Sequence, residues 1–123
     1  MKARLILAAV ITTGGMLYAT SALADCSYPK EPTSAPNGAT ATRDEMIASK
    51  VSLDAYQKEI NVYLECLDND ANERILAAGE DKAMVTNIKQ ATAKMHNAAI
   101  DGLQKLADEF NTQLRAFKNK EKS

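Results

Sequence analysis

The sequence has 123 residues, which leaves room for one domain. Its 15 basic and 16 acidic residues nearly balance, and two of the basic residues, Lys2 and Arg4, fall in a segment that we expect to be removed. The remaining chain is slightly acidic and lacks the cationic face that nucleic acids and anionic membranes require, so neither is expected as a partner.

The first 24 residues have the three parts of a secretory signal peptide. Lys2 and Arg4 precede an apolar run over residues 5–18, and Ala22-Leu23-Ala24 offers a cleavage site. The apolar run is too short and wrongly flanked for a mature membrane span. We therefore predict cleavage after Ala24, export to the periplasm or beyond, and no transmembrane anchor in the mature chain.

Residues 25–41 are predicted to form an extended arm. Pro29, Pro32 and Pro36 oppose helix formation, and Asn37-Gly38 is typical of a turn. An arm of this length reaches about 50 Å in polyproline form. It can therefore run back along the following helix, in which Cys66 lies about 36 Å from the start.

The two cysteines, Cys26 and Cys66, form an even set in a chain predicted to be exported, so we expect them to form a disulfide. The box Leu23-Ala24-Asp25-Cys26 is similar to a lipoprotein signal, but Asp25 stands where a small residue is needed. Cys26 is therefore expected to carry no lipid, which leaves its thiol available for the disulfide. The loop that the bond closes contributes about 4 kcal/mol in the chain-entropy description.

The first helix is predicted over about residues 43–78. Thr42 and Glu45 fit a capping box, and Gly79 is a typical C-terminal stop; a break near Asp70 is the alternative boundary. Apolar residues recur with heptad spacing and predict a seam that packs against another helix. The seam consists of Met46, Leu53, Tyr56, Ile60, Tyr63 and Leu67.

The second helix is predicted over about residues 82–118, with Asp81 as its cap. Its apolar residues repeat every eleven positions, as Met84, Met95, Leu106 and Phe117 do, which is close to the natural helical period. The predicted seam of this helix consists of Ile88, Met95, Leu103, Leu106, Phe110, Leu114 and Phe117.

These elements predict an all-α fold, a long antiparallel helical hairpin of coiled-coil type with a proline-rich arm stapled to it by one disulfide. A hairpin buries only one stripe of each helix. Apolar residues that lie off the seam need other cover, which the arm and a second copy of the chain could supply. These residues are Ile47, Val51, Val62, Leu64 and Ile100. We expect a protein partner or a homodimer.

Few residues indicate chemistry. His96 is the only histidine, and a haem site would pair it with a methionine, yet no haem-attachment motif occurs; a surface position or contact with Tyr63 is the alternative. Residues 68–79 begin like a calcium loop but carry Glu73 and Gly79 at positions that need Gly and Glu. No catalytic motif is present, so we predict no enzyme, no metal and no cofactor.

Several short segments resemble a group of small exported proteobacterial proteins of unassigned function. In chain order they are the opening Asp25-Cys26-Ser27-Tyr28-Pro29, Pro32 and Pro36, the entry from Gly38-Ala39-Thr40 to Glu45-Met46, Tyr63-Leu64-Glu65-Cys66-Leu67, His96-Asn97-Ala98-Ala99, and Phe110-Asn111-Thr112-Gln113-Leu114-Arg115. The resemblance covers nearly all of the mature chain. It implies an address in the Gram-negative envelope and supplies no catalytic or binding residue.

Three functions are therefore considered. The first is a non-catalytic interaction or structural module of the cell envelope with an unknown partner. The second is a periplasmic chaperone or stress protein that clasps clients between its helices. The third is a carrier of haem or another small molecule that uses His96.

Overall fold

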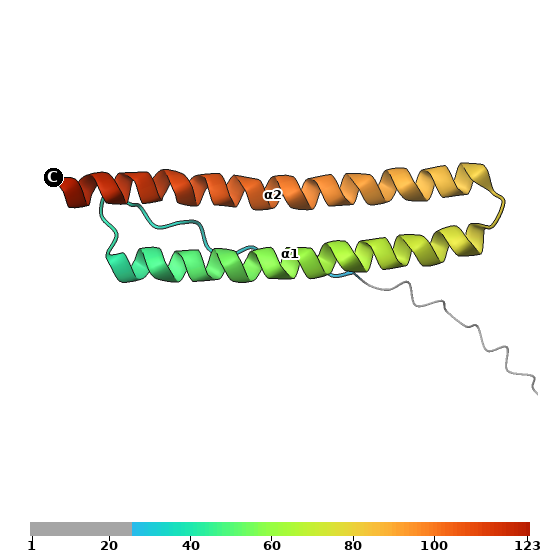
Figure 1. Cartoon of the computed structure of the whole chain (residues 1–123), viewed down its shortest axis with the longest axis horizontal. Coiled ribbons are helices and arrows are strands. Elements are labelled where there is room, and N and C mark those ends of the chain that lie inside the picture. The colour runs from blue at the N-terminus through green and yellow to red at the C-terminus, as the bar shows by residue number, and fades with distance from the viewer. Residues whose placement is uncertain (1–25) are drawn as a thin grey trace, which may run out of the picture.

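The computed structural model describes residues 26–123, which form two long antiparallel helices and an extended arm (Figure 1). Helix α1 spans Arg43–Ala78 and helix α2 spans Lys82–Lys122, while the arm occupies residues 26–41. The predicted all-α hairpin with a disulfide-tied arm is confirmed. The predicted signal peptide, residues 1–24, lies outside the described residues.

Helix α1 begins with the predicted capping box. The Thr42 backbone N–H donates to Glu45 Oε2 at 2.7 Å, and the Glu45 N–H donates to Thr42 Oγ1 at 3.2 Å. The first of these bonds holds the pKa of the Glu45 carboxyl below its ordinary value, since it favours the charged form. These contacts satisfy N–H groups that have no partner within the helix.

Helix α1 then runs unbroken to Ala78, so the alternative boundary near Asp70 is wrong. Asp70 and Arg74 form an ion pair across one helical turn at 3.6 Å, which supports the helix at this point. Gly79 ends the helix with a φ of 57°, a conformation that glycine adopts without steric cost.

Helix α2 begins at its predicted cap, where the Asp81 side chain accepts from the Met84 N–H at 3.0 Å. It ends at Lys122, beyond the predicted limit of Lys118. The added turn is anchored through Lys120. Its amine donates to the Ala41 carbonyl and lies 4.7 Å from the centre of the Phe117 ring.

The core consists of two clusters along the hairpin. The cluster nearer the turn comprises Tyr56, Ile60, Tyr63, Leu67 and Ala99. The cluster at the open end comprises Ala41, Met46, Phe110 and Phe117, with Ala35 and Leu53 against it. The arm thus contributes side chains to the core as well as covering it.

Most of the predicted seam faces the core, although to different degrees. Its buried members are Met46, Tyr56, Ile60, Tyr63, Leu67, Ile88, Phe110 and Phe117. Its half-buried members are Leu53, Leu103, Leu106 and Leu114. Ala99, which that seam omitted, is fully buried, where its small side chain lets the helices lie close together.

Met95 does not belong to the seam, because half of its surface is exposed. An eleven-residue step on a straight helix of 3.6 residues per turn advances by about 20° around the axis. The row that contains Met95 therefore drifts across the helix. Phe117 at its end is buried and Leu106 half-buried, whereas Met95 and Met84 fall outside the contact.

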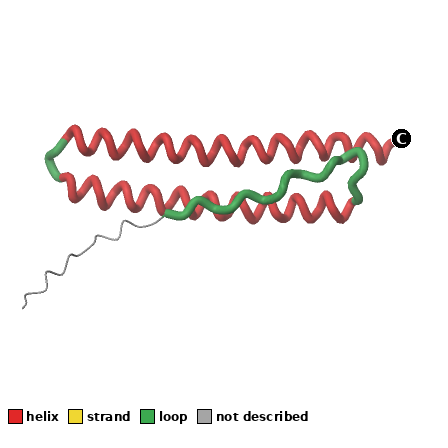
Figure 2. The backbone as a smooth tube through the Cα atoms, turned by 180° about the vertical axis from the view of Figure 1, so that it is seen from behind, coloured by secondary structure: helices red, strands yellow, loops and turns green. Residues whose placement is uncertain are grey.

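The arm lies along one side of the hairpin, from the middle of α1 to its open end (Figure 2). It starts at the disulfide with Cys66 and runs towards the N-terminus of α1, so that it is parallel to α2. In the opposite view it passes behind the helices (Figure 1). One side of the hairpin is therefore covered over half its length and the other is open.

Candidate functional site

The staple between the arm and α1 is formed as predicted. Cys26 and Cys66 are joined by a disulfide, with their Cα atoms 5.7 Å apart, and both residues are half-buried. Cys66 lies in the middle turns of the hairpin rather than at an end. The bond therefore holds the start of the arm far from the point where the arm enters α1.

Three tyrosines lie beside the staple. The Tyr28 ring meets the Tyr63 ring edge to face, with centroids 5.2 Å apart and an angle of 80°. The Tyr56 hydroxyl donates to the Tyr28 hydroxyl at 3.0 Å. Tyr28 remains half-exposed while Tyr56 is buried, so Tyr28 of the arm covers the two tyrosines of α1. Burial raises the pKa of Tyr56, and the hydrogen bond to Tyr28 adds to this effect.

We expect the stability of the protein to fall at high pH because of Tyr56. An acid whose pKa is higher in the folded chain stabilises the fold below its unfolded pKa of about 10, and this contribution is lost as the pH rises above that value. Urea unfolding between pH 8 and 11 should show a steeper loss for the wild type than for Tyr56→Phe, by up to about 1.4 kcal/mol per pH unit. Parallel curves for the two proteins would contradict this expectation.

The far end of the arm is held by α2. The Gly38 N–H donates to Gln113 Oε1 at 2.9 Å, and Gly38 itself is buried. The carbonyl of Asn37 accepts from the N–H groups of Thr40 and Ala41 and closes the turn. The arm is therefore fixed at both ends and crosses from α1 to α2 between them.

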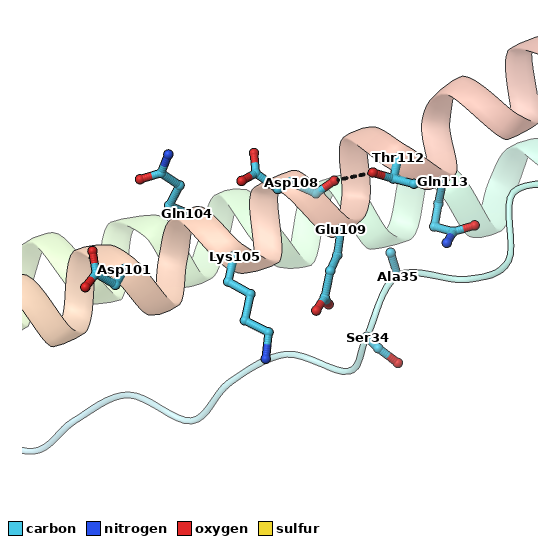
Figure 3. A pocket seen from close by; sticks show the side chains of 9 residues that line it. All are labelled: Ser34, Ala35, Asp101, Gln104, Lys105, Asp108, Glu109, Thr112 and Gln113. Carbon is cyan, nitrogen blue, oxygen red and sulfur yellow. Dashed lines mark hydrogen bonds between the residues drawn. The ribbon is translucent and has the colours of Figure 1, made fainter.

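A shallow groove lies between the arm and α2 (Figure 3). The side chains of Lys105, Glu109 and Gln113 point from α2 towards Ser34 and Ala35 of the arm. Gln104 and Asp108 point away from the arm. All of these charged groups are exposed to solvent, so the groove offers neither a buried base nor a desolvated charge for catalysis.

His96 lies on the open side of the hairpin and contacts Asp68 of α1, with 2.8 Å between Nε2 and the nearer carboxylate oxygen. The polar partner of His96 is therefore Asp68 and not Tyr63, whose ring packs against Tyr28. The hollow around His96 is lined by polar and small residues of both helices and by Ile75, with no methionine among them. A haem site that combines His96 with a methionine therefore has no support in this region.

The acidic segment after Leu67 is helical and forms no cation-binding loop. Asp68 and Asp70 are both engaged, with His96 and Arg74 respectively. Within residues 26–123, no group of three or more His, Cys, Asp or Glu side chains is arranged to hold a metal ion. Neither of the two helices described combines the length and the apolar character that crossing a membrane requires.

Comparison with known proteins adds no relative: no family model, no curated protein and no solved structure matches this chain.

The feature that stands out is apolar surface on a well-anchored hairpin. Four large apolar side chains of α1 point to solvent, namely Ile47, Val51, Val62 and Leu76. On α2, Met84, Met95 and Ile100 are also exposed. Sequence analysis singled out Ile47, Val51, Val62 and Ile100 as needing cover, and the arm leaves all four exposed. Leu64, the fifth such residue, packs against the core near Tyr63.

Proposed function

We propose that the mature chain is a non-catalytic module of the Gram-negative cell envelope that presents apolar surface to a protein partner. The observation that carries this proposal is the set of exposed apolar side chains on helices whose own core is already filled. Apolar side chains aligned on one face of a helix are the usual means by which a helix packs against another surface. The disulfide supports an oxidising compartment, because such bonds persist outside the cytoplasm.

A chaperone that clasps its clients between the two helices receives less support. The space between α1 and α2 is occupied by the two core clusters, and the arm closes one side of it. Opening this space would separate Tyr56 and Ile60 from Ala99 and would expose the tyrosines beside the staple. Binding on the outside of the hairpin needs no such rearrangement.

Site-specific photo-cross-linking in the envelope tests the proposed function. A photoreactive residue is placed at Val51 or Ile100, two exposed apolar positions, and at Asn87, an exposed polar control on α2. We expect Val51 or Ile100 to give a discrete adduct that excess purified chain competes away, and Asn87 to give none. If neither apolar position gives an adduct and the protein remains a strict monomer, the proposal is wrong.

A further inference from the structure

The outer face of α1, turned away from α2, carries a second apolar row. Ile47, Val51, Val62 and Leu76 expose 53%, 62%, 67% and 81% of their surface. At 3.6 residues per turn, these four positions fall within about 60° of the helix circumference. The buried seam of α1 is centred about 180° away, so the row lies opposite the contact with α2. Near the middle of the row, Val62 lines a hollow beside the start of the arm, together with Ser27 and Pro29.

Two charged residues of opposite sign lie in the same row. Lys58 precedes Val62 by four residues and Glu65 follows it by three, and both side chains are exposed. Both positions fall within the same arc of about 60° as the apolar residues. From Ile47 to Leu76 the row is therefore apolar, basic at Lys58, apolar at Val62, acidic at Glu65, and then polar at Asn69 before Leu76.

This row is complementary to itself in one orientation. When a second copy of α1 is laid antiparallel with the two-fold axis between Asn61 and Val62, Ile47 faces Leu76 of the second copy. Lys58 then faces Glu65 of the second copy, and the symmetry repeats both contacts. A parallel arrangement in register would place Lys58 against Lys58 and Glu65 against Glu65, which like-charge repulsion opposes.

We propose that the chain forms an antiparallel homodimer through the outer face of α1, with Val62 beside the two-fold axis. The proposal rests on the proposed function and names its partner as a second copy. The two Lys58–Glu65 pairs set the orientation and the register, as single polar positions do in helical pairs. The assembly has four parallel-lying helices, with the two α1 helices inside and the two α2 helices outside.

The size of the contact predicts a weak dimer. The row from Ile47 to Leu76 is about 44 Å long, and a helix is about 10 Å wide, so each copy contributes about 400 Å². Stable protein interfaces use about 800 Å² per partner. Dimerisation should therefore depend on concentration, and a local increase in concentration would favour it.

Analytical ultracentrifugation of the oxidised mature chain, from about 1 to 500 μM, tests the proposal together with charge-reversal variants. Lys58→Glu should weaken dimerisation about tenfold or more, because it sets two carboxylates against each other at two symmetric places. Glu65→Lys should do the same, and the double variant should restore the wild-type dissociation constant. Lys94→Glu, a matched reversal at an exposed position of α2, should have no effect.

Each outcome decides the question. Restoration by the double variant supports the dimer, and zero-length cross-linking should then join Lys58 to Glu65 in the covalent dimer band. A monomer at all concentrations overturns the proposal. A dimer whose dissociation constant is the same in Lys58→Glu as in the wild type also overturns it. If the chain is monomeric but Val51 still cross-links to a different envelope protein, only the homodimer is wrong and the proposed function stands.

Discussion

Replacing both Cys26 and Cys66 with serine is expected to lower the free energy of unfolding by about 4 kcal/mol. The disulfide spans 40 positions of the sequence, so its loss frees a long loop in the unfolded chain. For a domain of this size the melting temperature should fall by about 20 °C. Thermal unfolding followed by circular dichroism measures the effect.

The double variant avoids the unpaired thiol that a single substitution would leave. Ser27→Ala, at the exposed residue next to the staple, is the matched control and should melt with the wild type. Wild-type protein in reductant should reproduce the double variant. An unchanged melting temperature in that variant would show that the arm is held by Tyr28 and Gly38 alone.

Gly38→Ala is expected to destabilise the protein by about 2–3 kcal/mol. A Cβ atom at Gly38 would lie 1.8 Å from the carbonyl oxygen of Gln113 and 2.9 Å from the backbone nitrogen of Phe117. Backbone atoms within a helix cannot move aside as a flexible side chain can. The arm would have to lift from α2 and lose the hydrogen bond to Gln113.

Gly102→Ala is the matched control for this substitution. Its Cβ would meet the Tyr28 hydroxyl at 3.2 Å, the end of a half-exposed side chain, where a shift of a few tenths of an ångström relieves the contact. Alanine also favours the helix over glycine by about 1 kcal/mol. Urea unfolding should therefore find this variant equal to the wild type or more stable. Equal effects of the two substitutions would show that the close approach at Gly38 does not matter.

The helices could be predicted closely because their ends are marked by local chemistry. Thr42 with Glu45, Asp81 and Gly79 satisfy or terminate backbone groups within a few residues of themselves, so no tertiary information is needed. The low helix propensity near Asp70 affected only the alternative boundary, which was wrong. The ion pair between Asp70 and Arg74 is also local, but helix propensities of single residues do not include such pairs.

The candidate site was predicted less well, because it depends on which side chains meet across the hairpin. The eleven-residue repeat predicts Met95 in the seam. Because this repeat rotates around the helix axis, Met95 lies outside the contact between α1 and α2 and is half-exposed. The sequence offers the surface or Tyr63 as alternatives for His96; its side chain is partly exposed, and its polar partner is Asp68 of α1 rather than Tyr63. No pattern within one helix specifies the partner of a polar residue on another.

The sequence by itself determined the two helices and their caps, since these follow from local hydrogen bonding and periodicity. The even cysteine count favoured a disulfide but left open whether it joins Cys26 and Cys66 within one chain, as the structure shows. Only the tertiary structure decided which side of the hairpin the arm covers. That choice depends on close packing: Tyr28 fits against Tyr63, and Gly38 lies against the backbone of α2. The arm leaves most of the outer face of α1 exposed and borders that face only near Lys58 and Val62.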